Sequence, residues 1–167
     1  MSDTATRPDR PERRSADEQK RLEAALIELF EKRIVFNQTL GLKVTSVAPG
    51  TVRATFEMRH ELIGHAGYGR LHGGVISAVL DALGGLALMA AIGEAFPHDN
   101  TLQVMQRFMK LATIDLRVDF LRQGIGQTFT ATAEPTRLGS RIGNTQMRLV
   151  SDQGVLIATG AAVYAVA

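Results

Sequence analysis

Two glycines and one carboxylate have the residue types and the spacing for chemistry on a carbonyl group. Gly73 and Gly74 open an apolar run that extends to Gly93, and Asp81 is the only ionisable side chain in it. Because an isolated carboxylate is costly to bury, a chain that keeps one in an apolar segment usually gives it a partner or a chemical task. Asp81 is therefore the first candidate for a general base or a nucleophile.

The two glycines begin a predicted helix, and the first turn of a helix leaves backbone N–H groups uncovered. The helix dipole adds partial positive charge there, which stabilises an oxyanion or a polarised carbonyl oxygen. The alternative is that Gly73 and Gly74 only permit a tight turn or close packing against a sheet. With a carboxylate at this spacing, we expect an oxyanion site.

Gly73 and Asp81 cannot contact the same carbonyl carbon from one helix. Eight residues at a rise of 1.5 Å each separate them by roughly 12 Å. If both groups act on one carbonyl, Asp81 comes from a second copy of the chain, and two such helices run antiparallel across an interface. We therefore predict a homodimer or a dimer of dimers. The alternative for Asp81 is a buried structural carboxylate, with Ser77 as its local partner four residues earlier.

Composition restricts the class of protein. The chain has 167 residues, of which 45% are hydrophobic and 22% charged, which fits one globular domain. A net charge of only +2 argues against a nucleic-acid-binding surface, although the sequence pI is about 9.3. The absence of cysteine excludes disulfides and a Cys nucleophile, and the four histidines have no zinc-binding spacing. We expect a cytoplasmic protein without a metal or cofactor.

The apolar run after Gly73 is long enough to raise the question of a membrane span. Asp81 near its middle would cost roughly 2.5 to 3.5 kcal/mol on insertion scales, and five glycines weaken the helix. A buried central helix is therefore predicted, with no membrane span.

The hydrophobic pattern predicts an α+β domain over residues 15–167, preceded by a disordered charged tail over 1–14. Ser15 and Glu18 have the spacing of a capping box, and the helix they begin is expected to run to about Phe36. The other predicted elements are a half-buried hairpin over 42–58, a loop over 59–70, the central helix, a short helix over 102–109, and strands over 113–122, 127–134, 142–150 and 155–165. We expect an antiparallel sheet that curls around the central helix, with the last four strands as a meander.

The clearest of these strands is 113–122, where apolar and polar residues alternate. Its predicted apolar face consists of Ile114, Leu116, Val118 and Phe120. The opposite face consists of Thr113, Asp115, Arg117 and Asp119.

With these features the sequence resembles the hotdog-fold thioesterases, in particular the phenylacetate-pathway (PaaI-like) type of small acyl-CoA thioesterase. The resemblance rests on His72-Gly73-Gly74, on Asp81 seven residues after Gly74, and on the strand over 113–122. It covers about residues 37–166. It implies a hotdog fold, in which a curved antiparallel sheet wraps around a long central helix, an acyl-CoA substrate, and sites shared between subunits.

The resemblance also assigns roles to residues near the glycines. Relatives place an Asn before His-Gly-Gly that helps to hold the substrate carbonyl or the water, where this chain has Gly64-His65. His65 either replaces that Asn with an imidazole that titrates near neutral pH, or is an ordinary loop histidine. His72 is expected to orient the loop. Thr113 aligns with a Ser or Thr that orients the attacking water, and an ordinary strand residue is its alternative.

An acyl-CoA needs an apolar slot for its acyl group and cations for its phosphates. Met105, Phe108 and Met109 are candidates for the slot, although core packing explains their helical spacing as well. Arg122, Arg137 and Arg141 lie near predicted strand ends and are candidates for the phosphates, with ordinary solvation as the alternative. Gly74 and Ser77 complete the expected substrate-binding residues. 

The resemblance and the residues together predict hydrolysis of a medium-chain, long-chain or aromatic acyl-CoA. One alternative is a non-catalytic acyl-CoA-binding hotdog module, because His65 stands where relatives have Asn. A second is a hotdog dehydratase or hydratase. Those enzymes place a catalytic His beside the acid, whereas no His falls inside the predicted central helix.

Overall fold

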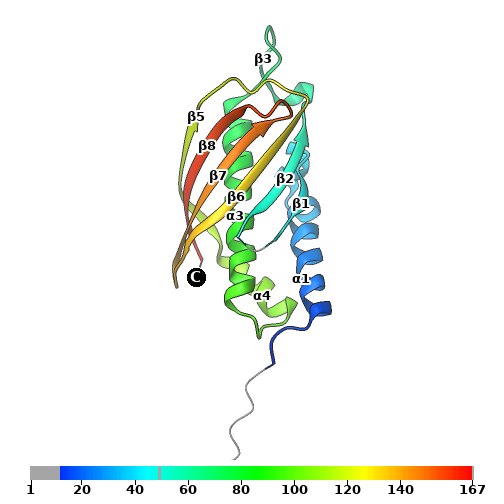
Figure 1. The fold of residues 1–167 in the computed structure, drawn as a ribbon, viewed down its shortest axis with the longest axis vertical. Helices are drawn as coiled ribbons and strands as arrows, with labels where there is room; N and C mark the ends of the chain where they lie inside the picture. The colour runs from blue at the N-terminus through cyan, green and yellow to red at the C-terminus, as the bar shows by residue number, and fades with distance from the viewer. Residues whose placement is uncertain (1–11, 49, 167) are drawn as a thin grey trace, which may run out of the picture.

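The computed structural model describes residues 12–48 and 50–166, so the predicted tail lies mostly outside the described residues. A curved antiparallel sheet wraps around one long helix, α3, with α1 beside that helix and α4 near its C-terminal end (Figure 1). In chain order the elements are α1 (Ala16–Glu28), η1 (Leu29–Arg33), α2 (Val35–Leu40), β1 (Lys43–Ser46), β2 (Val52–Glu57), η2 (His60–Leu62), β3 (Ile63–His65), β4 (Arg70–Leu71), α3 (Gly73–Ala95), α4 (Thr101–Arg107), η3 (Phe108–Lys110), β5 (Ala112–Phe120), β6 (Thr128–Leu138), β7 (Ile142–Ser151) and β8 (Leu156–Ala165). The predicted hotdog arrangement is confirmed.

The six strands of the main sheet are ordered β1-β2-β6-β7-β8-β5, and all neighbours are antiparallel. β6, β7 and β8 form a meander, as predicted. β5 pairs with β8 and not with β6, so the predicted four-strand meander is wrong for this strand. Alternation within a strand specifies its two faces but not its neighbours. β5 therefore forms one edge of the sheet.

The central helix α3 is buried over most of its surface. Leu80, Leu83 and Leu88 are fully buried against the sheet. Within the described residues, α3 is the one helix long and apolar enough to cross a membrane, yet 61% of its most apolar window is buried inside the protein. The predicted buried helix is confirmed. Ala78 and Ala82 lie on the side away from the sheet and are only partly buried; we call this side the open face of α3.

The start of the N-terminal helix is as predicted, because the Ser15 hydroxyl accepts a hydrogen bond from the Glu18 N–H at 3.2 Å. Arg14, which the prediction placed in the tail, is bound to the domain. Its guanidinium donates to the Gly93 carbonyl in the last turn of α3 and to the Asp99 carbonyl in the loop that follows, both at 2.7 Å. A cation is favourable there because helix dipoles leave C-terminal carbonyls partly negative. Arg14 is therefore in contact with the folded domain.

The N-terminal helix does not continue to Phe36 as one helix. It passes into a single π-helical turn, η1, then breaks at Ile34, which has extended backbone angles, before α2. The buried Asn37 side chain donates to the Phe30 carbonyl at 3.0 Å and so satisfies a backbone group near the break. This turn brings Phe30 and Ile34 against the open face of α3.

Candidate active site

The start of α3 is arranged by His72, which is its N-cap residue. The His72 Nδ1 atom accepts a hydrogen bond from the Gly74 N–H at 2.9 Å. His72 thus caps the helix start, and its predicted role in orienting the loop stays a prediction. Because the Gly74 N–H has this partner and the Gly73 N–H has none among the described residues, Gly73 is the stronger candidate for an oxyanion donor.

Gly73 lies in a pocket of about 460 Å³, which we call the helix-start pocket. Arg122, one of the predicted phosphate-binding residues, lines this pocket, and so does Arg70, which no sequence pattern singled out. The phosphate role of Arg122 stays a prediction. Arg137 and Arg141 lie instead at the β6–β7 turn, which packs near the C-terminal end of α3. Arg137 and Arg141 therefore do not line the helix-start pocket, and their predicted role in binding phosphates stays a prediction.

The carboxylate of Asp81 accepts a hydrogen bond from the Thr113 hydroxyl, with 2.9 Å between Oδ1 and Oγ1. This places Thr113 beside the predicted base, where a water-orienting hydroxyl is needed. Ser77 is not a partner of Asp81, because its hydroxyl donates to the Gly73 carbonyl at 3.1 Å. The suggested local pair of Ser77 and Asp81 is therefore wrong, and Ser77 instead completes a backbone contact within the helix.

A β-bulge in β5 turns Thr113 toward α3. Thr113 pairs with Tyr164 and Asp115 with Val163, so Ile114 is the extra residue between them. The extra residue reverses the alternation of side chains between the two faces of β5. Thr113 therefore lies on the face toward α3, where Ile114 would lie in a regular strand. Ile114 is 57% exposed, and its predicted place on a buried apolar face is wrong. Phe120, on the helix-facing side next to Gly73, is 55% exposed.

Tyr164 supports the helix at Asp81 from the sheet side. Its hydroxyl donates to the Asp81 backbone carbonyl at 2.8 Å. Burial, and then the negative charge of Asp81, raise the pKa of the Tyr164 hydroxyl far above its ordinary value, so it stays protonated as a donor. The side chain fits because Gly84 has no Cβ to collide with its hydroxyl. Sequence reasoning missed Tyr164, since nothing in its local pattern distinguishes it from other strand residues.

Asp81 and Thr113 line a largely apolar pocket of about 280 Å³, which we call the Asp81 pocket. The rest of its wall comes from η1, α2, α3 and the start of β5. Met105 and Met109 do not line it. Met109 is 84% exposed, and Met105 packs against the core. Core packing, the alternative given for their spacing, applies to Met105, and the role of the methionines in an acyl slot stays a prediction.

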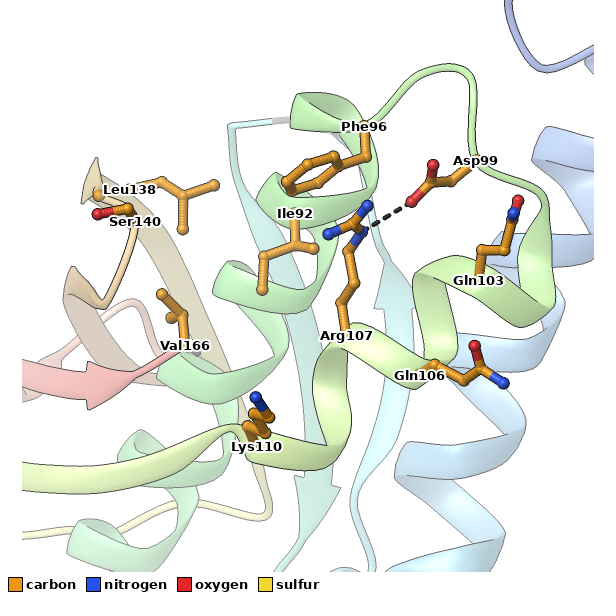
Figure 2. Close-up of a pocket in the computed structure, with 11 residues that line it drawn as sticks. Ile92, Phe96, Asp99, Gln103, Gln106, Arg107, Lys110, Leu138, Ser140 and Val166 are labelled. Atoms are coloured by element: carbon orange, nitrogen blue, oxygen red, sulfur yellow. Dashed lines mark hydrogen bonds and ion pairs between the residues drawn. The ribbon is translucent and has the colours of Figure 1, made fainter.

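Figure 2 shows a third pocket, of about 460 Å³, between the C-terminal end of α3, α4 and the β6–β7 turn. The Arg107 guanidinium lies 3.5 Å from the centre of the Phe96 ring and is ion-paired with Asp99 at 2.7 Å. Neither Asp81 nor Gly73 lines this pocket.

The oxyanion donor and the carboxylate do not meet within one protomer. Gly73 and Asp81 lie in different pockets and are separated by eight residues of uninterrupted helix, or roughly 12 Å. His65 lies in neither pocket. It is exposed in the β3–β4 hairpin, with its ring 4.8 Å from that of Tyr68, and Gly64 lies against His72 instead. The role suggested for His65 stays a prediction.

Comparisons with known proteins agree on one family. The family model described as "Thioesterase superfamily" matches residues 68–158. The medium/long-chain acyl-CoA thioesterase YigI of Escherichia coli strain K12 is 32% identical over 142 residues, which cover 83% of this chain and 90% of that protein. A Shewanella oneidensis structure related to the thioesterase superfamily has a TM-score of 0.85 at 35% identity, and covers 92% of this chain and 99% of that one. Mouse thioesterase superfamily member 2, at 19% identity and a TM-score of 0.67, covers 92% and 99% and shares the fold.

Proposed function

This chain belongs to the thioesterase superfamily, and from that premise we propose that it hydrolyses the thioester of a medium- or long-chain acyl-CoA to the free acid and CoA. The observation that carries the proposal is the hydrogen bond from Thr113 to Asp81 inside an apolar pocket. Such a pocket accepts an acyl chain, while the carboxylate at its wall meets the thioester carbon. The PaaI-like subtype stays a prediction, because the matching model describes the superfamily as a whole.

Asp81 acts most simply as a general base. One of its oxygens accepts the Thr113 hydrogen bond, and the other is available to take a proton from a water. The water oxygen bonds to the thioester carbon while Asp81 takes the proton, and the tetrahedral intermediate then expels the CoA thiolate. The thiolate leaves with the proton that Asp81 held. Direct attack by Asp81 through an acyl-anhydride intermediate is the alternative route.

The Gly73 N–H stabilises the carbonyl oxygen as it becomes negative. Its position at the positive end of a long helix and its lack of another partner support this role. Arg70 and Arg122 in the same helix-start pocket supply cations for the phosphates of CoA. These assignments require the Asp81 of one subunit to meet the Gly73 of another, since one helix holds the two apart.

Pairing of two β5 edges is the arrangement of subunits that we propose. β5 presents an unpaired edge, and its ends carry the exposed apolar side chains Ile114 and Phe120. Asp81 and Thr113 of one subunit approach Gly73 and Phe120 of the other when the strands run antiparallel. Because Ile114 is an extra residue in the bulge, the position midway between Thr113 and Phe120 is Arg117, and the twofold axis passes near it. In this arrangement the open faces of the two α3 helices meet.

The test follows thiol release from a panel of acyl-CoAs of four to sixteen carbons. Asp81→Asn keeps the size of the side chain and its capacity to accept from Thr113, but it removes the base. We expect it to lose about a thousandfold or more in kcat while its melting temperature and oligomeric state stay close to those of the wild type. Undiminished turnover in this variant would contradict the mechanism.

A non-catalytic acyl-CoA-binding module is the second candidate function, and the position of His65 supports it. The histidine that stands where relatives have Asn faces Tyr68 in an exposed hairpin and lines neither pocket. Such a module binds intact acyl-CoA without releasing thiol, so calorimetry beside the thiol assay separates the two. The cytoplasmic location stays a prediction.

A further inference from the structure

The N-terminal segment and α3 enclose the Asp81 pocket between them. The apolar residues of this wall include Phe30, Ile34, Phe36, Ala82, Gly85 and Met89. The first three come from the π-helical turn, the break at Ile34 and α2, which follow the N-terminal helix. The wall therefore depends on the break at Ile34, which turns these side chains toward the helix.

Three pocket residues of α3 lie in one row. Asp81, Gly85 and Met89 are four residues apart, so each lies nearly above the last on the helix surface. Gly85 is roughly 6 Å and Met89 roughly 12 Å beyond Asp81 along the helix axis. A chain attached to a carbonyl at Asp81 that follows this row meets Gly85 halfway and Met89 at its far end.

We propose that the acyl chain of the substrate lies in the Asp81 pocket along this row, and that Gly85 and Met89 determine the chain length the enzyme prefers; this rests on the function proposed above. A methylene needs about as much room as a water molecule, roughly 30 Å³, so 280 Å³ holds about nine. The pocket as it stands fits a medium chain. A longer chain must displace Met89, whose unbranched side chain is flexible enough to move.

The pocket of Figure 2 is the competing location, and its chemistry is less suitable. Ile92, Phe96 and Leu138 give it an apolar floor, but Arg107 and Asp99 place an ion pair at its rim. An alkyl chain gains nothing from charged groups that must give up water. The reacting carboxylate is also absent from its wall.

Gly85 offers a clean way to shorten the Asp81 pocket. A Cβ at Gly85 would lie 3.6 Å from the Leu111 side chain, an ordinary contact, so a side chain can begin there without moving the backbone. Gly85→Val should lower kcat/KM for decanoyl-CoA, relative to butanoyl-CoA, by about tenfold or more. Met89→Ala should raise the ratio of hexadecanoyl-CoA to decanoyl-CoA by about fivefold, because it removes the side chain at the far end.

Leu138→Phe is the control for the competing location, since it adds bulk to the pocket of Figure 2 and leaves the Asp81 pocket unchanged. Met105→Ala controls for the loss of a partly buried methionine outside the Asp81 pocket. Both should leave the chain-length profile unchanged. A profile that shifts with Leu138→Phe and not with Gly85→Val would overturn the proposal. Where Gly85→Val does not fold, Gly85→Ala replaces it, with an expected shift of about threefold.

Failure of this inference is distinguishable from failure of the proposed function. If the wild type releases thiol but Gly85→Val keeps the wild-type profile, the acyl site is wrong and the thioesterase function stands. If the wild type releases no thiol, the proposed function fails, and calorimetry with decanoyl-CoA still tests the pocket. If Gly85→Val weakens the binding of decanoyl-CoA about tenfold, the acyl site is supported. If the affinity is unchanged, the acyl site is wrong.

Discussion

Replacing Thr113 by Val removes one hydroxyl from the site and little else. Val has the shape of Thr and an equal preference for strands, so β5 and its bulge should persist. The lost contact is the 2.9 Å hydrogen bond to the Asp81 carboxylate. Hydrogen bonds to charged groups contribute about 1.5 to 3 kcal/mol, and Thr113 is exposed in the single protomer, so the lower half of that range applies.

At about 1.4 kcal/mol per tenfold in rate, we expect kcat to fall about ten- to thirtyfold in Thr113→Val. KM should change little, because the hydroxyl contacts the base and not the acyl chain. The assay is steady-state thiol release from decanoyl-CoA, with the melting temperature measured in parallel. A kcat equal to that of the wild type would refute the assigned role.

Thr113→Ser distinguishes the hydroxyl from the methyl group. Ser keeps the donor to Asp81 and loses only the methyl, so it should recover most of the lost kcat. If Ser loses as much as Val, packing by the Thr methyl is what matters, and the argument from the hydrogen bond is wrong.

Three further predictions concern the interface, the helix and the N-terminal cap. Arg117→Cys should form a disulfide-linked dimer on oxidation, because the proposed twofold axis brings two copies of this position together in a chain without other cysteines. Gly84→Ala should lower the free energy of unfolding by about 1 to 3 kcal/mol in denaturant titrations, because its Cβ would collide with Tyr164. The Thr101 backbone N–H donates to the Glu18 carboxylate and lowers its pKa. The ionised Glu18 therefore stabilises the fold above about pH 4.5, and this stabilisation is lost as the pH falls further. Melting temperatures should show Glu18→Gln destabilised at pH 7 and nearly equal to the wild type in acid.

The first two of these predictions have a matched control variant. Arg53→Cys lies on an exposed site of β2, far from the β5 edge in strand order, and should stay monomeric on denaturing gels after oxidation. Gly85→Ala is the next residue of the same helix and has room for a Cβ, so its unfolding free energy should be unchanged or higher. An equal loss at both glycines would show that steric collision with Tyr164 is not the cause. A pH-independent effect of Glu18→Gln would contradict its assigned ionisation.

Sequence patterns predicted the features that depend on neighbours in the chain. The Ser15 cap, the helix start at His72 and the alternation in β6 to β8 are all local signals, and the structure has each of them. The second half of the predicted capping box is absent, because the Glu18 carboxylate accepts from the Thr101 N–H and not from the Ser15 backbone. The 12 Å between Gly73 and Asp81 follows from helix geometry alone. That separation was enough to predict a site divided between two copies of the chain.

Features set by contacts between distant segments were not predictable in this way. The bulge at Ile114 interrupts an alternation that continues on both sides of it, so the sequence placed Thr113 on the wrong face of β5. The wall of the Asp81 pocket contains both Phe30 and Met89, which lie far apart in the sequence and share no local pattern. Hydrophobic spacing instead selected Met105 and Met109, because apolar periodicity identifies a buried face without showing which cavity that face lines.

A mixture of two inactive variants tests the divided site most directly. Gly73 is the first residue of α3, a position that accepts proline, and the extended backbone of His72 suits a following proline. Gly73→Pro therefore removes the N–H of the proposed oxyanion donor while the helix remains. We expect Gly73→Pro and Asp81→Asn to be nearly inactive when each is expressed alone.

Coexpression of the two variants should restore activity if each site takes Asp81 from one subunit and Gly73 from the other. In a mixed dimer, one site then carries both substitutions and the other carries neither. Random pairing makes half of the dimers mixed, so the population should recover roughly a quarter of the wild-type activity. If each subunit holds a complete site, every site carries one substitution and nothing is recovered. The absence of recovery in purified mixed dimers, with each variant folded, would therefore refute the shared site, whatever the oligomeric state.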